Sequence, residues 1–289
     1  MPCFNALPFL EAAVRSVLEQ PECLELIVAD GGSSDGSLQA LEALANQHPR
    51  RLRLLHGPDS GPADALNRAL RQARGTLIGW LNADDLYPPR AIGRAVQALA
   101  CQPNWLMVYG EGEEFDSDSG QRSRYPTKPP AAGLHGFRSH CFICQPTVVF
   151  RRTLAALLGP FDTSFKTAFD FDYWLRAFAA FPERIGFIPH LQGLTRLHHA
   201  TITSSQRHRV AIEATRLLAR HFGPAPADRL NGYGLELQRG LAATPPGIGF
   251  REHLESVFAE AEPWLDPKAL RALRQHWLQG PEQSASQRW

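Results

Sequence analysis

The chain has 289 residues, of which 44% are hydrophobic and 20% are charged, a composition typical of soluble globular proteins. Its formal net charge of +1 gives no support for nucleic acid as a partner. Its five cysteines, an odd number at scattered spacings, do not form a disulfide framework, and no apolar run approaches the ~20 residues of a membrane span. We therefore expect a cytoplasmic protein with one large domain and an appendage.

The first part of the chain alternates apolar strands with amphipathic helices. Helices are expected at residues 8–19, 38–47 and 63–73, and strands at 24–30, 51–56 and 77–81. Strands that alternate with helices of this length form crossover units, so we predict an α/β fold with a mainly parallel sheet. Right-handed crossovers bring the loops that follow the strands to one edge of the sheet, where such folds bind ligands.

Two of these expected strands end in acidic residues. Asp30 is followed by the Gly- and Ser-rich loop 31–37, and the strand at 77–81 is followed by Asp84 and Asp85. Adjacent carboxylates repel each other and avoid apolar surroundings, and a divalent cation such as Mg²⁺ or Mn²⁺ would relieve both problems. Alternatively, the two acids are solvated turn residues before a helix. Two acidic strand ends in one sheet favour a shared ligand over coincidence.

The middle of the chain continues this pattern with one interruption. A helix is expected at 91–100, strands at 105–109, 145–150 and 186–189, and a further helix from residue 151. The polar, Gly/Pro/Ser-rich stretch 110–130 is either a mobile loop near a site or a plain surface excursion. Asp170 and Asp172 lie where another helix begins, and an acid in a first turn is favoured by the helix dipole, so an N-cap is the simplest explanation for them.

The last third of the chain shows no strand alternation. We predict a sheet domain at residues 1–205 and a helical tail at 206–289, packed on that domain. The last ten or so residues are polar and Ser/Gln-rich and are expected to be disordered. Arginines scattered through the tail could support peripheral membrane attachment, although such residues usually form a solvated face. Cys141 and Cys144 form a C-x-x-C without a second pair, which is too few ligands to indicate structural zinc.

Five short motifs together resemble the family-2 glycosyltransferases, which have the GT-A nucleotide-diphospho-sugar transferase fold. They are the Pro-x-Phe-Asn turn at 2–5, the Asp-Gly-Gly-Ser-Ser-Asp-Gly loop at 30–36, the helix start at 61–67, the Asn-Ala-Asp element at 82–84 and the segment at 169–176. Each motif alone is weak, but their order and spacing are specific, and the match covers roughly residues 2–200. The variant with Gly31 and Asp64 is similar to a subgroup from bacterial O-antigen and capsule gene clusters.

Three departures from the family pattern stand out. Asn82 replaces the first Asp of the family's Asp-x-Asp element, and Phe169 replaces the usual Glu before Asp170. The family also begins with a short apolar strand before its Pro-x-Phe-Asn turn, and Met1 stands where that strand should be ending. We expect that the start is assigned too late, rather than that the element is lost. A chain that starts at Met1 would have an unfilled slot in its sheet.

The resemblance implies a hexosyltransferase-type enzyme (EC 2.4) that inverts the anomeric carbon. Its donor would be a nucleotide-diphospho-sugar, with a UDP-sugar favoured, and its acceptor a hydroxyl of a saccharide or lipid-linked molecule in bacterial surface polysaccharide synthesis. With a lipid-linked acceptor, the transfer reaction would take place at the inner face of the plasma membrane. The residues that match the donor-binding motifs are Pro2, Phe4, Asn5, Asp30, Gly32, Ser33, Asp35, Asp64, Asn67, Asn82, Ala83 and Asp84.

The resemblance also implies roles in catalysis. We assign Asp84, Asp85 and His199 as ligands of Mn²⁺ or Mg²⁺. Either of the two adjacent histidines, His198 or His199, would contact the metal or the diphosphate. A carboxylate must take the acceptor's proton, and Asp170 matches the family's base, with Asp172 as the second choice. Gln145 and Arg152 are expected on the acceptor side.

Two alternatives come from other functional classes. The chain could be a degenerate GT-A module that binds without catalysis, because Asn82 and the absent first strand weaken the site. It could also be a nucleotidyltransferase, but such enzymes normally carry a Gly-rich loop with a basic residue near the N-terminus, and none is visible here.

Overall fold

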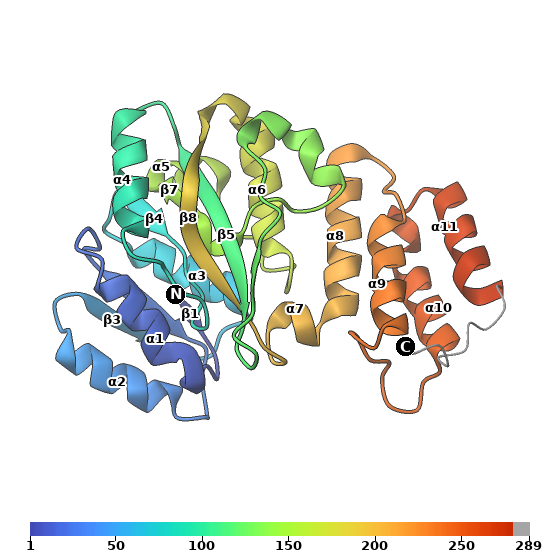
Figure 1. Cartoon of the computed structure of the whole chain (residues 1–289), viewed down its shortest axis with the longest axis horizontal. Helices are drawn as coiled ribbons and strands as arrows, with labels where there is room; N and C mark the ends of the chain where they lie inside the picture. Colours follow the sequence, from blue (N-terminus) through green and yellow to red (C-terminus); the bar gives the residue numbers. More distant parts are fainter. Residues whose placement is uncertain (280–289) are drawn as a thin grey trace. The chain divides into compact units, whose positions relative to one another are not determined.

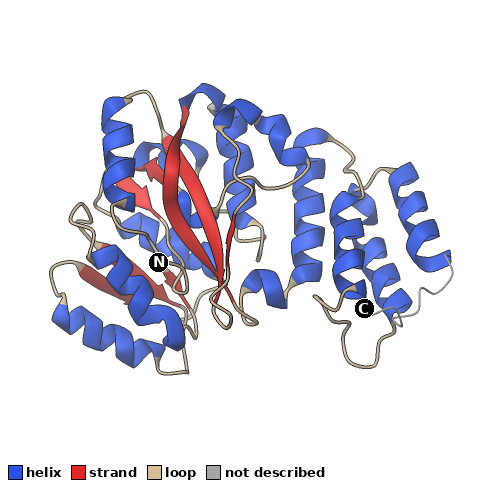
Figure 2. Cartoon of the chain, in the orientation of Figure 1, coloured by secondary structure: helices blue, strands red, loops and turns tan. Residues whose placement is uncertain are grey.

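The computed structural model describes residues 1–279 and divides into two units, Met1–His198 and His199–Trp289. The first unit holds every strand of the described chain, and the described elements of the second unit are helices (Figures 1 and 2). The division follows His198, whereas the sequence predicts it after residue 205. Within residues 1–279, no helix has both the length and the apolar character needed to cross a membrane.

The strands of the first unit form two sheets. One is parallel, with the order β1 (Pro2–Cys3), β2 (Leu26–Asp30) and β3 (Leu52–His56). The other is mixed, with the order β4 (Leu77–Gly79), β7 (Val149–Arg151), β5 (Met107–Asp116) and β6 (Arg122–Arg124), and with β8 (Ile185–Leu197) parallel to β5. The sequence predicts one mainly parallel sheet. The difference arises because no strand of the described chain is hydrogen bonded between β2 and β4.

The helices of the first unit flank these sheets at the positions that the sequence predicts. They are α1 (Leu7–Leu18), α2 (Ser37–Gln47), α3 (Pro62–Gln72), α4 (Ala91–Cys101), α5 (Arg152–Leu158) and α6 (Phe169–Ala180). In α1, proline in the first turn favours initiation, and residues 10, 13, 14, 17 and 18 are buried at helical spacing. These side chains pack with Val28 and Leu41, so burial of one helix face joins α1 to the parallel sheet.

Two strands are much longer than the sequence predicts. β5 continues through Asp116 into the stretch expected to be a loop, and β8 continues through Leu197. The two strands pair with each other, with register shifts around Glu111. The sequence hid this pairing because glycines and acids interrupt the apolar pattern. Gly112 is needed for close approach, since a Cβ there would lie 2.5 Å from Cβ of Cys144. Residues Gln145–Thr147, predicted to be a strand, form a 3₁₀ turn (η3) before β7.

The second unit has its own hydrophobic core. Its helices are α7 (Ile202–Ser205), α8 (Arg207–Phe222), α9 (Asp228–Gln238), α10 (Phe250–Ala261) and α11 (Pro267–Arg274), followed by a π-helical turn at Gln275–Gln279. Leu230, Leu254, Phe258 and Trp277 are buried in one cluster. These helices agree with the predicted helical tail. The disorder expected at the end of the chain falls largely outside the described residues.

Candidate functional site

Asp30, the last residue of β2, organises the loop that follows it. Its buried carboxylate accepts hydrogen bonds from the backbone N–H groups of Gly32 (3.0 Å) and Ser33 (3.1 Å) and from the Ser33 hydroxyl. His56 Nδ1 lies 3.0 Å from the same carboxylate. Burial alone would raise the pKa of Asp30, but these hydrogen bonds outweigh it and hold the pKa below its usual value. Asp30 is therefore an ionised group whose oxygens face its own loop.

Side chains from both sides tie this loop to the start of α1. Asn5, at φ 50°, accepts a hydrogen bond from Ser34 N (2.8 Å) and donates its own N–H to Ser33 Oγ (2.9 Å). Asp35 accepts from the backbone N–H groups of Leu7 (3.0 Å) and Ser37 (2.9 Å), so it serves the first turns of two helices. The loop 31–37 is thereby held in one conformation against the N-terminus of α1.

The two carboxylates that follow β4, Asp84 and Asp85, have different surroundings. Asp85 is buried and accepts hydrogen bonds from Asn82 Nδ2, Thr195 Oγ1 and the backbone N–H of Arg196. Burial, followed by the neighbouring charge of Asp84, raises the pKa of Asp85 to about 7. The Asp84 side chain is 27% exposed, and its Oδ2 lies 3.1 Å from His198 Nε2. Asp85 therefore anchors β8, and Asp84 is the carboxylate that a ligand can reach.

The two acidic strand ends meet at the N-terminal end of α1. The ring of Phe9 lies 4.6 Å from the ring of His198, and the guanidinium of Arg196 lies 4.5 Å from the Phe9 ring centroid. Leu7, in the same helical turn, is bonded to Asp35. Thus one turn of α1 touches both the loop 31–37 and the Asp84–His198 pair.

The Asp84–His198 pair fits a divalent cation that shares its coordination with a phosphate ligand. No group of three or more His, Cys, Asp or Glu residues within residues 1–279 is arranged to hold a metal by itself. Mg²⁺ sites that act on phosphates usually take one or two carboxylates and complete the shell with phosphate oxygens and water, and imidazole nitrogen suits several first-row transition metals. His198, rather than the exposed His199 that begins the second unit, lies beside Asp84, while Asp85 points inward.

The side chain of Asn82 is hydrogen bonded to other side chains of the protein. Its Oδ1 accepts a hydrogen bond from Trp80 Nε1 (3.0 Å), and its Nδ2 donates to Gln145 Oε1 (2.8 Å) as well as to Asp85. Gln145 Nε2 in turn donates to the Trp80 carbonyl oxygen (2.8 Å). The amide oxygen of Asn82 is therefore engaged by the Trp80 indole, and Gln145 binds the same segment.

The start of α6 lies against this network. The ring of Phe169 stacks on Trp80, with centroids 5.4 Å apart. Asp170 is partly buried in the first turn of this helix, next to Phe169. Asp172 is fully buried and accepts a hydrogen bond from Arg176 Nε (2.8 Å).

The remaining predicted residues lie mostly in structural positions. Asn67 is buried and exchanges two hydrogen bonds with the Phe161 backbone, and Arg152 donates to the Ala73 carbonyl oxygen. Asp64 accepts from the backbone N–H of Ser60. Pro2 and Ala83 are buried, whereas the Phe4 side chain, next to Asn5, is exposed.

Sequence reasoning missed three residues of this site. His56 ends β3 directly opposite Asp30 in the parallel register. A polar residue at the end of each of two neighbouring strands is a sequence signal that could have identified His56. Thr195 and Arg196 bind Asp85 and Asp84 from β8, and Arg196 Nε donates to the Asp84 carbonyl oxygen (2.8 Å). Nothing in the local sequence shows that β8 reaches this far.

Known proteins share both the sequence pattern and the fold. The sequence model described as glycosyl transferase family 2 matches residues 1–157. An uncharacterized glycosyltransferase of Rickettsia prowazekii is 26% identical over 219 residues, which are 71% of this chain and 65% of that protein. A glycosyltransferase of Mycobacterium bovis named for PGL/p-HBAD biosynthesis is 29% identical over 182 residues, 62% of this chain and 68% of its own length. The chain spans 31% to 65% of three Rickettsia relatives.

Two solved structures have the same fold. Staphylococcus aureus TarS residues 1–349, in complex with UDP-GlcNAc, aligns with a TM-score of 0.61 at 17% identity and covers 94% of this chain and 82% of its own. The mannosyltransferase PcManGT from Pyrobaculum calidifontis, in complex with GDP-Man and Mn²⁺, aligns with a TM-score of 0.58 at 21% identity, covering 95% and 77%. With the family match over more than half of its length, the chain belongs to glycosyl transferase family 2 and has the GT-A fold.

Proposed function

We propose that this chain transfers a sugar from a nucleotide-diphospho-sugar to a hydroxyl group, with inversion at the anomeric carbon. The observation that carries the proposal is the accessible Asp84–His198 pair, held beside an ordered loop at the N-terminal end of α1. The two similar structures are complexes with a UDP-sugar and a GDP-sugar, which supports this donor class. We favour a UDP-sugar donor and an acceptor in bacterial surface polysaccharide synthesis.

The loop 31–37 is proposed to hold the nucleotide, with Asp30 acting through the loop. Because Asp30 accepts the N–H groups of Gly32 and Ser33, those donors are directed inward rather than toward a diphosphate. The groups that face outward around the loop are the Phe4 ring, 66% exposed, and the His56 side chain, 49% exposed. An aromatic ring and an imidazole suit contact with a nucleobase and its ribose.

Asp84 and His198 are the residues that would hold Mg²⁺ or Mn²⁺ against the diphosphate. When bound, the metal would act as a Lewis acid that stabilises the leaving nucleoside diphosphate. The protein's own contribution is to hold Asp84 in place: Arg196 fixes its backbone carbonyl, and the buried Asp85 locks the neighbouring backbone to β8. Asp85 and His199, which the sequence offered as further ligands, are not part of this proposed pair.

Asp170 is the proposed general base. The acceptor hydroxyl must lose a proton as it attacks, and a carboxylate within hydrogen-bond reach performs that step. Stacking of Phe169 on Trp80 brings the first turn of α6 next to the strand end that carries Asp84. Asp172 is two residues further into the helix, where it is buried and paired with Arg176, so a stabilising role suits it better.

Hydrolysis of the donor tests this function without knowledge of the acceptor. We expect the purified chain to release nucleoside diphosphate slowly from a panel of UDP- and GDP-sugars when Mn²⁺ is present. Asp84→Asn should lower that rate at least ~100-fold, because a carboxylate ligand is lost. The matched control is Glu42→Gln, which also neutralises one carboxylate, on the exposed face of α2. Equal rates for the two variants would remove Asp84 from the proposed site.

A further inference from the structure

The large apolar side chains that are exposed on the described part of the second unit gather at one end of its helices. They are Ile202 of α7, 37% exposed, and Leu241 and Ile248, 57% and 38% exposed, which lie between α9 and α10. We call the connecting residues 239–249 the α9–α10 loop. In Figure 1 this loop lies at the lower end of α9, and α7 lies at the lower end of α8. Single exposed apolar residues are ordinary on protein surfaces, but a group of them indicates a site of interaction.

Contacts between the helices show that these ends meet. Arg207, the first residue of α8, forms an ion pair with Glu236 in the last turn of α9 (3.2 Å). The ring of His208 lies 6.3 Å from the ring of His253, which is in the first turn of α10. The short helix α7 ends just before α8 begins. Together these helix ends and the α9–α10 loop form one surface, which we call the loop face.

The α9–α10 loop has the composition of a segment that can enter lipid. From Gly240 to Gly249 it contains no charged residue, and Thr244 has the only polar side chain. Pro245 and Pro246 carry no backbone N–H group, so the centre of the loop has few donors that would lose hydrogen bonds to water in an apolar medium. The loop can therefore leave water at a lower cost than an ordinary polar loop.

The backbone of the loop is fixed beside its exposed side chains. The Leu241 N–H donates to the carbonyl oxygen of Glu236 (2.9 Å), and the Ile248 N–H donates to that of Pro245 (3.1 Å). Ala242 packs against the hydrophobic core of the second unit. A loop that is already ordered loses little conformational entropy when it binds, so Leu241 and Ile248 are available for contact with a partner.

Basic residues surround the apolar loop. Two arginines flank it in the chain and two lie in the first turn of α8: Arg239, Arg251, Arg207 and Arg209. The acids in the same helical turns are Glu236, which is paired with Arg207, and Glu252. The loop face therefore has more positive than negative charge around an apolar centre. This arrangement complements a surface that is apolar inside and anionic outside.

We propose that the loop face docks on a bilayer that contains anionic phospholipid. Leu241 and Ile248 would enter the boundary between headgroups and acyl chains, while the arginines contact headgroup phosphates. Apolar insertion and positive charge act together, because one weak signal alone gives only marginal attachment. The inference concerns the second unit and does not depend on the proposed function.

Co-sedimentation of the full chain with vesicles tests the proposal. One set of vesicles contains equal parts of phosphatidylglycerol and phosphatidylcholine, and the other contains phosphatidylcholine alone. We expect binding to the mixed vesicles to be at least ~10-fold tighter, and this gain should shrink at high salt. Arg239→Gln should weaken binding to the mixed vesicles about fivefold and leave binding to phosphatidylcholine unchanged, because one headgroup contact is lost.

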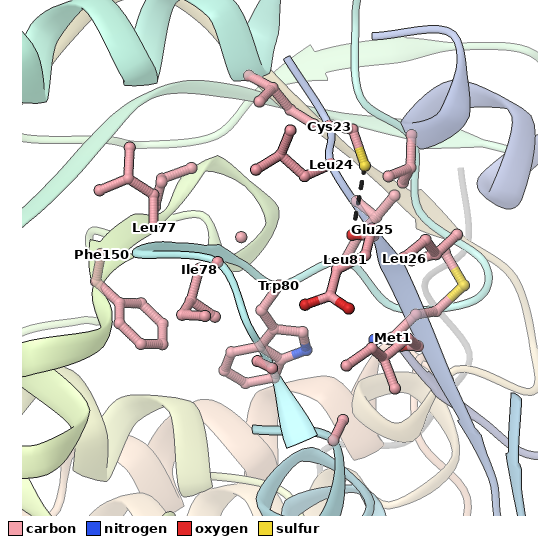
Figure 3. Close-up of a pocket in the computed structure, with 18 of the residues that line it drawn as sticks. Met1, Cys23, Leu24, Glu25, Leu26, Leu77, Ile78, Trp80, Leu81 and Phe150 are labelled. Atoms are coloured by element: carbon pink, nitrogen blue, oxygen red, sulfur yellow. Dashed lines mark hydrogen bonds between the residues drawn. The ribbon is translucent and has the colours of Figure 1, made fainter. Parts of the chain in front are cut away.

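The apolar contribution has a matched control. Leu241→Ser should weaken binding to the mixed vesicles about tenfold, because less apolar area enters the lipid. Leu157→Ser changes a leucine of α5 that is 59% exposed, close to the 57% of Leu241, and should leave binding unchanged. Leu157 is a better control than Leu24, because Leu24 also lines an apolar cavity of the first unit (Figure 3).

Hydrogen exchange on the native chain gives a second measurement that needs no variant. Amides of the α9–α10 loop should exchange at least ~10-fold more slowly when mixed vesicles are present, because lipid excludes water from them. No binding to the mixed vesicles, or equal losses in Leu241→Ser and Leu157→Ser, would overturn the proposal. A dimer in sedimentation equilibrium without vesicles that Leu241→Ser abolishes would also overturn it, since the loop face would then bind a second copy of the chain.

Discussion

At the scale of single residues, the two acids at the start of α6 have different surroundings. Asp172 is buried against Arg176, whose guanidinium also donates to the carbonyl oxygens of Leu158 and Pro160. Asp170 lies on the first turn, next to the ring that stacks on Trp80. The sequence places both acids in this turn, but which of them faces the protein interior depends on Arg176 and on the packing of the whole helix.

This difference predicts a separation of activity from stability. Asp170→Asn should lower kcat for sugar transfer by about 10²–10⁴-fold and affect stability less than activity, because the proton acceptor is lost while the amide keeps the size of the side chain. Asp172→Asn should keep kcat in the folded protein but lower the free energy of unfolding by about 2 kcal/mol, because a buried ion pair is broken. Steady-state kinetics and urea unfolding measure both effects. Full activity in Asp170→Asn would eliminate our choice of base.

Asp85 gives a prediction about pH. Burial raises the pKa of this carboxyl to about 7, so the folded state holds its proton at pH values where the unfolded state has lost it. Its ionisation therefore costs stability progressively from about pH 4 to pH 7. Asp85→Asn removes that cost, so the stability of the variant relative to the native chain should rise by about 2 kcal/mol between pH 5 and pH 8.

Urea unfolding of the two proteins at both pH values measures this difference. Asp228→Asn, in the first turn of α9, is a control with a carboxylate outside the first unit. A relative stability that is the same at pH 5 and pH 8 would show that Asp85 ionises as an ordinary carboxyl.

At the scale of elements, local patterns predict the helices and the strands β2, β3 and β4 well, but they miss the length of β5 and β8. The amphipathic spacing of α1, α2 and α3 is a local property, and their bounds lie within a residue or two of those expected. The extension of β5 and β8 depends on pairing between distant segments, and Gly110 helps to make it possible, since a Cβ there would lie 2.7 Å from the carbonyl oxygen of Ile188 in β8. The position of His198 beside Asp84 follows from that pairing, so the sequence alone left the choice between two histidines open.

The start of α1 offers a test at this scale. Asp35 bonds the backbone N–H of Leu7 and that of Ser37, so it serves as a cap for two helices. We expect Asp35→Ala to lower the free energy of unfolding by about 1–2 kcal/mol. Because Phe9 of the same helix contacts His198, donor affinity should also fall. The matched control is Asp118→Ala, an exposed acid of the β5–β6 turn. Chemical unfolding that gives the same stability for both variants would contradict the capping role.

At the scale of the whole molecule, the sequence predicts two parts, an α/β unit and a helical unit, and both are present. The division of the strands into two sheets could not be predicted from the spacing of residues in the sequence, because which strands pair depends on how distant segments pack. The hydrogen bonding of Asp30, which orders the loop 31–37, likewise includes His56 from a neighbouring strand.

The most direct test of the proposed donor site is calorimetric titration of the chain with UDP and GDP, with and without Mn²⁺. We predict that the native chain and Glu42→Gln bind one of the two nucleotides at least tenfold more tightly with Mn²⁺. In Asp84→Asn and His198→Ala that gain should disappear, because the proposed metal pair is broken. Retention of the full Mn²⁺-dependent gain by both variants would contradict the placement of the donor site at Asp84 and His198.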